Sequence, residues 1–193
     1  MTPEFLAQAL AIPLPRAQLW APVMRPALEL AEINTPLRVA AWLSQVGHES
    51  GRLRYARELW GPTPAQARYE PQTKLSRTLG NTRSGDGKRY MGRGLIQVTG
   101  RANYASTTRR LRELVGESAP DVVQAPALLE VPEWAALSAA IYWRDRGLNR
   151  WADEGDILTL TRRINGGTNG LADRQALYTS ATAAILTSDW NAS

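Results

Sequence analysis

The residues between Thr35 and Gly51 carry the pattern that most constrains this fold. Thr35-Pro36 is a favourable N-cap and first-turn pair for an α-helix, and Gly51 is a suitable residue for ending one. Apolar residues recur between them at helical spacing, so one face of this helix should be buried. Trp42 and Glu49 fall on that face, two turns apart. We therefore expect a helix that carries the carboxyl group of Glu49 at its C-terminal end.

Similar punctuation and periodicity recur along the rest of the chain. A short helix should begin at Thr63-Pro64, and longer helices are expected over residues 103–115, 132–146, 156–164 and 171–186. Residues 80–94 are rich in Gly, Asn, Asp and Ser, which predicts a loop or a small hairpin. Residues 95–99 are the one candidate strand. The sequence thus predicts a mainly α fold with a small β element or long loop.

Composition limits the classes of site that the chain can hold. No Pro, Gly or Ser run divides the 193 residues, so we expect a single domain over residues 1–193. The first thirty residues mix charges and prolines, which fits neither a signal peptide nor a membrane span, and we expect the chain to be made in the cytoplasm without membrane insertion. The absence of cysteine and the single histidine give little material for a metal centre, so none is expected.

The formal net charge of +5 comes almost entirely from arginine, because Lys74 and Lys88 are the only lysines. Such a charge implies attraction to a polyanion without identifying it. A nucleic-acid-binding protein should concentrate its basic residues in a stripe or a recognition helix, whereas these arginines are spread along the chain. We therefore expect no nucleic-acid partner.

Glu49 and Glu58 form the candidate catalytic pair. Hydrolysis of a glycosidic bond needs one carboxyl group that donates a proton and a second that is ionised. The apolar face and the negative end of the helix dipole should raise the pKa of Glu49, which makes it the candidate acid. Arg52, Arg54 and Arg57 lie near Glu58 in the sequence and would favour its ionised form if a guanidinium reaches it, which makes Glu58 the candidate base. Most glutamates are solvated surface charges, so the pair alone is not decisive.

Two other features do not compete with this interpretation. The glycine-rich residues 80–94 lack the first glycine and the final Ser or Thr of a phosphate-binding loop. The lone His48 has no nucleophile elbow to serve, and a single histidine at a helix end is usually structural.

Residues 91–104, with the sequence MGRGLIQVTGRANY, closely resemble the signature of family 19 glycoside hydrolases, the family of chitinases and endolysins. Four further blocks resemble the family in the same order along the chain. The block at residues 48–51 is similar to the segment with the general acid, and the block at 57–59 to the segment with the base. Residues 164–167 and 171–174 are similar to its C-terminal substrate-binding blocks. The resemblance covers roughly residues 35–178.

The resemblance implies a two-lobed, lysozyme-like helical fold with a small β element or loop beside the cleft, and a single catalytic domain without a separate wall-binding module. It also implies an inverting mechanism that uses no cofactor. Glu49 would be the general acid and Glu58 the general base. Thr99 stands where the family has a hydroxyl that helps the base hold the attacking water, a task suited to a group that both donates and accepts.

A set of substrate-binding residues is implied as well. Gln97 and Asn103 would bind sugar amide and hydroxyl groups, and Asn165 and Arg174 would come from the opposite lobe. From the residues alone, Asn165 before two glycines could equally cap a helix end, and Arg174 could be an ordinary solvated arginine. The aromatic residues that could stack on sugars, or instead pack in the core, are Tyr90, Tyr104 and Trp60.

The substrate is either chitin or peptidoglycan, because both have a β-1,4-linked backbone of N-acetylated sugars. Residues 85–90 and 171–174 are more similar to phage and prophage endolysins than to plant chitinases, which resemble secreted proteins with disulfides and signal peptides. The excess of arginine also suits a wall that bears lactyl and peptide carboxylates. We therefore expect a monomeric enzyme that degrades peptidoglycan for host cell lysis, and that reaches the periplasm and cell wall after a membrane-permeabilising partner releases it. A chitinase, a lytic transglycosylase and a non-enzymatic glycan-binding module remain the alternatives.

Overall fold

The computed structural model of the chain describes residues 1–188 and residue 190. The chain divides into two compact units. One comprises Met1–Tyr55 with Tyr142–Ser193, and the other comprises Ala56–Ile141. The division falls inside helix α8 (Pro132–Asp145), which contributes residues to both units. We call them the Glu49 unit and the Glu58 unit after the candidate catalytic glutamate that each contains.

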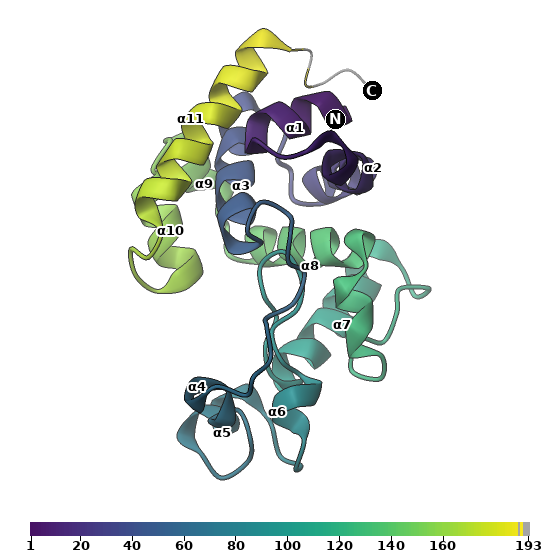
Figure 1. Cartoon of the computed structure of the whole chain (residues 1–193). Coiled ribbons are helices and arrows are strands. Elements are labelled where there is room, and N and C mark those ends of the chain that lie inside the picture. The colour runs from purple at the N-terminus through teal and green to yellow at the C-terminus, as the bar shows by residue number, and fades with distance from the viewer. Residues whose placement is uncertain (189, 191–193) are drawn as a thin grey trace. The chain divides into compact units, whose positions relative to one another are not determined.

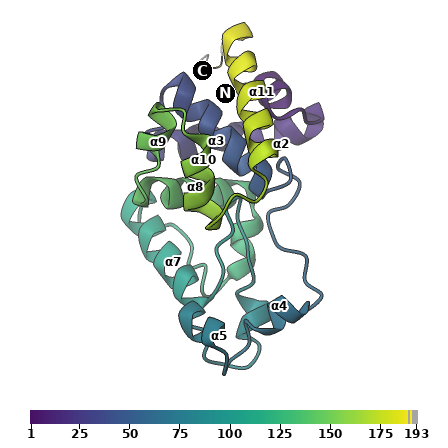
Figure 2. The ribbon, with the colours of Figure 1, turned by 90° about the vertical axis from the view of Figure 1, so that its left-hand side faces the viewer.

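The Glu49 unit is built from longer helices that pack on one another. Helix α3 lies against α11, and α1 contacts α2, α3 and α11, as Figure 1 shows. Helices α9 and α10 pack beside α3 on another side (Figure 2). The helices of this unit are α1 (Pro3–Leu10), α2 (Leu14–Leu30), α3 (Pro36–Glu49), α9 (Asn149–Asp153), α10 (Ile157–Asn165) and α11 (Leu171–Thr187).

Helix α3 forms the centre of the core of this unit. Every residue from Val39 to Gly47 is buried. The rings of Trp42 and Trp143 meet edge to face, 5.5 Å apart, a geometry that adds about 1 kcal/mol to the burial of the two rings. A Cβ added at Gly47 would lie 2.9 Å from the side chain of Leu10, so the absence of a side chain lets α1 approach α3 closely. This packing fixes the direction in which α3 presents its last residues.

The Glu58 unit has shorter helices joined by longer connections. Its helices are α4 (Pro64–Ala67), α5 (Lys74–Leu79), α6 (Asp86–Arg89), α7 (Arg101–Val115) and the 3₁₀ helix η1 (Pro126–Glu130). Both α4 and α5 begin with a capping box, in which the N-cap threonine and the third helical residue bond each other's backbone N–H groups. Such reciprocal caps stabilise helices that are too short to be stable by propensity alone.

The mainly α prediction is confirmed, and most predicted helices are present with ends shifted by one or two residues. The helix predicted from Thr35 is α3, and the Thr35 hydroxyl accepts a hydrogen bond from the Arg38 N–H at 3.3 Å. The loop predicted at residues 80–94 contains the four-residue helix α6. No helix in the described part of the chain is long and apolar enough to cross a membrane.

The strand predicted at residues 95–99 is wrong. Arg93 and Val98 exchange backbone hydrogen bonds of 3.1 and 2.7 Å, which closes a turn over the residues between them. Leu95 and Ile96 are buried within that turn, so their apolar character reflects core packing. The small β element consists, in the described residues, of two isolated antiparallel bridges, from Arg93 to Arg57 and from Arg93 to Val98.

Candidate active site

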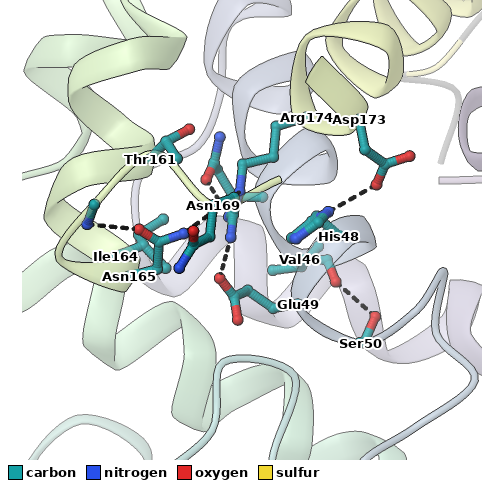
Figure 3. Close-up of polar contacts among 12 residues, drawn as sticks. Val46, His48, Glu49, Ser50, Thr161, Ile164, Asn165, Asn169, Asp173 and Arg174 are labelled. Atoms are coloured by element: carbon teal, nitrogen blue, oxygen red, sulfur yellow. Dashed lines mark hydrogen bonds and ion pairs between the residues drawn. The ribbon is translucent and has the colours of Figure 1, made fainter. Parts of the chain in front are cut away.

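Glu49 ends helix α3 beside a buried arginine of α11. Arg174 donates from Nη2 to the Glu49 carboxylate and from Nη1 to Oε1 of Gln45 at 2.6 Å (Figure 3). Gln45 and Glu49 lie one helical turn apart, so both can meet the same guanidinium group. The Arg174 side chain is 1% exposed, whereas that of Glu49 is 23% exposed. A buried cation therefore holds one oxygen of this carboxyl group, and part of the group remains open to solvent.

A second ion pair lies directly beside the first. His48 Nδ1 is 2.7 Å from Asp173 Oδ2, and Arg52 donates to Asp173 Oδ1 at 2.9 Å. Burial acts to raise the pKa of Asp173, but the hydrogen bond from His48 and the charge of Arg52 outweigh it, so this pKa is lowered. A Cβ on Gly170 would lie 2.1 Å from the His48 ring, so the histidine contacts this glycine where no other side chain would fit. Two consecutive residues of α3 thus pair with two consecutive residues of α11.

Asn165 and Arg174 both bond the loop that joins α10 to α11, where Arg174 Nε donates to the Asn169 carbonyl at 3.4 Å. Asn165 Oδ1 accepts from the Gly167 N–H, and Asn165 Nδ2 donates to the Asn169 carbonyl, each at 2.8 Å. Asn165 therefore makes the contacts of a helix-end residue, and its sugar contact remains a prediction. Arg174 is neither a solvated arginine nor free to contact a sugar, because it is buried. We revise its role from substrate binding to the positioning of Glu49.

Glu58 is held by neutral donors. Its Oε1 accepts from the Gly92 N–H at 2.7 Å, and its own N–H donates to the Gly92 carbonyl at 2.9 Å. Gln66 Nε2 donates to Glu58 Oε2 at 3.3 Å and to the Leu59 carbonyl at 2.8 Å. Burial raises the pKa of Tyr69, and the charge of Glu58 and a hydrogen bond to it raise it further. These contacts fix the carboxylate from several sides.

The expected arginine partner of Glu58 is absent among the described residues. Arg57 instead approaches Glu130, with its Nη1 3.5 Å from Oε2. Arg52 pairs with Asp173, and the Arg54 guanidinium lies 5.2 Å from the centre of the Tyr55 ring. None of these three guanidinium groups reaches Glu58, so the condition under which they would favour its ionised form is not met. Proximity in sequence did not translate into contact because each arginine has another partner.

The two bridges at Arg93 bring the rest of the signature segment toward Glu58. Because Arg93 pairs with Arg57 on one side and Val98 on the other, the backbones that carry Glu58 and Gln97 run close together. A Cβ added at Gly92 would lie 2.4 Å from Gln97 Oε1, so the Gln97 amide lies over the glycine whose N–H holds Glu58. The Gln97 side chain is exposed, which suits a residue that binds a ligand.

Thr99 lies just before α7, and Asn103 lies in the first turn of that helix. Asn103 Nδ2 donates to the Thr99 backbone carbonyl at 2.7 Å, so this amide supports the segment that carries Thr99. Within the described residues, no hydrogen bond joins the Thr99 hydroxyl to Glu58. The water-holding role of Thr99 and the sugar contact of Asn103 remain predictions.

Two of the three candidate stacking residues pack in the core. Tyr90 is 1% exposed and Tyr104 is 0% exposed, with their ring centres 5.2 Å apart. Burial raises the pKa of Tyr104 to about 12. The Arg101 guanidinium also lies 4.6 Å from the centre of the Tyr90 ring. The prediction that Tyr90 binds a sugar is therefore wrong. Trp60 is partly exposed and lines an open groove of about 820 Å³.

Four residues near the two glutamates were missed by the sequence analysis: Gln45, Gln66, Tyr69 and Tyr142. Gln45 could have been found from its spacing of one turn before Glu49, and Gln66 from the Thr-x-x-Gln capping pattern. Tyr142 donates to the carbonyl groups of Arg163 and Ile164 at 3.2 and 3.4 Å, at the end of α10. Burial raises its pKa, and the charge of Glu49 adds to this effect. No local signal marks Tyr69 or Tyr142.

The predicted site residues thus divide between the units. Glu49, Asn165 and Arg174 belong to the Glu49 unit, and Glu58, Tyr90, Gln97, Thr99 and Asn103 to the Glu58 unit. No group of three His, Cys, Asp or Glu side chains in the described residues could hold a metal ion. Each of the two glutamate carboxyl groups is thus held by side chains or backbone of its own unit.

Comparison with known proteins identifies relatives in sequence and in structure. The chain is 34% identical over 175 residues to a glycosyl hydrolase family 19 domain-containing protein of Haemophilus influenzae, a match that covers 78% of this chain and 82% of that protein. It is 31% identical over 130 residues to an endochitinase of Arabidopsis thaliana, a match that covers 67% of this chain and 39% of the endochitinase. No protein-family model matches the chain.

Two solved structures have a similar fold. Chitinase C of Streptomyces griseus superposes with a TM-score of 0.67 at 20% identity, covering 95% of this chain and 76% of that chain. A bacterial family 19 chitinase superposes with a TM-score of 0.61 at 18% identity, covering 94% of this chain and 95% of that one. At this level of identity the similarity establishes the fold, which is the lysozyme-like helical fold of these chitinases.

Proposed function

Because this chain belongs to glycosyl hydrolase family 19 and is a glycoside hydrolase, we propose that it hydrolyses β-1,4 glycosidic bonds of peptidoglycan by an inverting mechanism. The observation that best supports this proposal is the difference between the contacts of the Glu49 and Glu58 carboxyl groups. Glu49 is paired with a buried cation, and Glu58 is held by neutral donors. An inverting hydrolase needs an acid and a base with different surroundings, set about 6.5–9.5 Å apart on either side of the bond.

In this mechanism Glu49 gives its proton to the glycosidic oxygen as the bond breaks. Proton donation leaves a negative charge on Glu49, and the buried Arg174 guanidinium stabilises that charge. Arg174 thus acts through Glu49 and does not contact the substrate. Gln45 fixes the other edge of the guanidinium, so the cation is already in place when the charge develops.

Glu58 accepts a proton from the water that attacks the sugar carbon. The Gly92 N–H and the Gln66 amide each occupy one acceptor position of its carboxylate, which leaves lone pairs for the water. Thr99 would accept from the same water or donate to the carboxylate. Gln97, Asn103 and Asn165 would bind amide and hydroxyl groups of the sugars. No cofactor takes part in the proposed reaction.

The positive charge of the chain favours peptidoglycan over chitin. Peptidoglycan carries lactyl and peptide carboxylates, which suit a chain with a formal charge of +5.

We propose that residues 1–193 act as one catalytic domain and as a monomer that serves in cell lysis. The enzyme would be made in the cytoplasm and reach the periplasm when a membrane-permeabilising protein releases it. Lysis of cells that express the enzyme alone would contradict that dependence.

Chitin is the second candidate substrate, because relatives in sequence and in structure are named as chitinases. The experiment that separates the candidates digests purified peptidoglycan and N-acetylchitohexaose with the wild type, Glu49→Gln and Glu58→Gln, and identifies product ends by mass spectrometry. We expect reducing sugar ends from peptidoglycan at a higher kcat/KM than from the hexasaccharide, and loss of both activities in both variants.

Each alternative predicts a different outcome of that experiment. A chitinase would cleave the hexasaccharide faster than peptidoglycan. A lytic transglycosylase would leave 1,6-anhydro ends and remain active as Glu58→Gln. A glycan-binding module would bind the polymer and release no new ends.

A further inference from the structure

A second polar pocket lies in the Glu58 unit, around helix α6. It has a volume of about 350 Å³, and the residues that line it are Arg83, Ser84, Gly85, Asp86, Arg89, Tyr90, Arg101, Val123 and Gln124. Neither Glu58 nor any contact of its carboxylate contributes to this lining. Three arginines and a single carboxylate face one small space, which is an unusual concentration of positive charge.

One of the three arginines is neutralised within the pocket wall. Arg101 makes a two-pronged ion pair with Asp86, at 2.5 Å from Nη2 and 3.0 Å from Nε. Asp86 also accepts from the backbone N–H groups of Thr82 and Arg83. Burial acts to raise the pKa of Asp86, but these hydrogen bonds outweigh it and the pKa is lowered. Asp86 is thus a fixed anion whose charge is already matched by Arg101.

The charges of Arg83 and Arg89 have no such match. Arg89 donates to the Gln124 carbonyl at 2.9 Å, the Val123 carbonyl at 3.3 Å and the Tyr90 hydroxyl at 3.1 Å, all of which are neutral acceptors. In the part of the chain that the structure describes, no carboxylate lies within ion-pair distance of the Arg83 or Arg89 guanidinium. The pocket lining therefore includes two exposed arginines that have no carboxylate partner among the described residues.

Tyr90 contacts two of the three arginines, Arg89 and Arg101. Its buried ring lies 4.6 Å from the Arg101 guanidinium and 5.6 Å from that of Arg89. Cation–π contacts and the carbonyl hydrogen bonds hold Arg89 in a defined position before any ligand arrives. A preformed guanidinium binds an anion with less loss of side-chain entropy than a free one. The position that we expected to stack on sugars thus supports a charged surface.

We propose that this pocket binds carboxylates of the peptidoglycan stem peptides, with Arg83 and Arg89 as the anion-binding residues. The proposal rests on the proposed function, because it assigns a specificity site to that same reaction. Guanidinium groups bind carboxylates through charge-assisted hydrogen bonds, and the Nη1 group of Arg89 takes no part in the three contacts that hold this side chain. Chitin carries no carboxylate. The pocket therefore distinguishes the two glycans by the carboxylates of the stem peptide and not by the sugar backbone that is cleaved.

The direct test compares matched substrates with matched variants of the full chain. The substrates are peptidoglycan, the same peptidoglycan with its carboxyl groups amidated, and N-acetylchitohexaose. The variants are Arg83→Gln, Arg89→Gln and the double variant. The control is Arg68→Gln with Arg77→Gln, which removes the same charge from exposed side chains of the same unit, outside this pocket. Arg89→Gln could disturb the residues that Arg89 bonds. The single variant Arg83→Gln removes a charge without breaking those contacts, so it keeps the test valid in that case.

For peptidoglycan we expect kcat/KM to fall about tenfold in the double variant, which is the effect of losing one or two charge-assisted hydrogen bonds. Amidation should slow the wild type by a similar factor and should not slow the double variant further. Hydrolysis of the hexasaccharide should be the same for the wild type, the double variant and the control.

Calorimetric titration with muramyl dipeptide, its amide and inorganic phosphate identifies the ligand. We expect only the free dipeptide carboxylate to bind the wild type, and Arg83→Gln to weaken it. Equal activity of the wild type and the double variant on peptidoglycan would overturn the assignment, as would phosphate binding that matches or exceeds that of the dipeptide. Absence of peptidoglycan cleavage by the wild type would instead contradict the proposed function itself.

Discussion

The surroundings of Glu49 and Glu58 differ in both architecture and charge. Glu49 lies where two long helices pack, and a buried guanidinium from a residue 125 positions away holds it. Glu58 lies among short helices and turns, and a backbone N–H and an amide hold it. A cation beside an acid stabilises the negative charge that proton donation leaves behind. The guanidinium thus lies at the candidate acid Glu49 and not at the candidate base Glu58, where the sequence placed the nearest arginines.

The largest expected effect comes from removing either carboxyl group. Glu49→Gln and Glu58→Gln should each lower kcat on peptidoglycan by about a thousandfold, within the usual range for acid–base groups. An aryl glycoside with a good leaving group needs no proton, so Glu49→Gln should recover much of its rate on that substrate and Glu58→Gln should not. The control is Glu133→Gln, which changes an exposed glutamate of α8. Recovery by Glu58→Gln alone would reverse the assignment of the two roles.

Loss of the buried cation should give the next largest effect. Arg174→Met leaves Glu49 and Gln45 without their shared partner, so we expect the free energy of unfolding to fall by about 2 kcal/mol, less than for a fully buried pair because Glu49 is partly exposed. Activity should fall about a hundredfold, since the charge on Glu49 is no longer stabilised. Chemical denaturation measures the free energy of unfolding, and steady-state kinetics measures the activity. Arg162→Met, on the exposed face of α10, should change neither quantity. A fully active Arg174→Met enzyme would contradict the positioning role.

The neutral donors of Glu58 can be tested through the two capping boxes. Gln66 and Ser76 are both the third residue of a capped helix, but only Gln66 also reaches Glu58. Gln66→Ala and Ser76→Ala should each lower stability by about 1 kcal/mol. Only Gln66→Ala should lower kcat, by about tenfold, the effect of one hydrogen bond to a charged group. If Ser76→Ala reduces kcat equally, the effect arises from helix stability and not from contact with the base.

The smallest expected effect is a difference in acid stability between the units. Burial opposes ionisation of Asp86 and Asp173, but the arginine and histidine partners prevail and both pKa values lie below the ordinary 3.8. Their stabilising contributions are therefore present above pH 3.8 and are lost as the pH falls through the lowered values. The loss should be larger at Asp86, whose side chain is 3% exposed, than at Asp173, which is 37% exposed.

Thermal unfolding between pH 2 and pH 6 tests this order. Asp86→Asn should flatten the pH dependence of Tm more than Asp173→Asn does. Equal flattening by the two variants would show that burial does not set the size of the effect.

Local patterns were sufficient to predict six helices and missed α1, α5, α6 and α9. The predicted helices are α3, α4, α7, α8, α10 and α11. Thr35 and Asp156 cap α3 and α10 as their positions indicate, because a cap acts on its own helix. Helix α2 was not predicted, since Pro22 and Pro26 lie inside it and proline normally disfavours a helix interior. Its buried face, which includes Trp20 and Met24, stabilises it despite the two prolines.

Long-range partners were beyond the reach of the sequence alone. The two glutamates were found because the motif residues are local, but the Arg174–Glu49 pair joins residues far apart in the chain and depends on how α11 packs against α3. The arginines near Glu58 in the sequence were the wrong partners for the same reason. The burial of Tyr90 was equally hidden, because an aromatic residue in a glycine-rich segment carries no sign of what covers it.

The most direct test of the two-carboxylate mechanism is the anomeric configuration of the first product. Proton NMR recorded during the first minutes of hydrolysis of peptidoglycan strands, before mutarotation, resolves the new reducing end. Water attack on the face opposite the leaving group turns a β-linkage into an α-anomer, and this is the result that we predict. A β-anomer or a 1,6-anhydro end as the first product would contradict the assignment of Glu49 as acid and Glu58 as base.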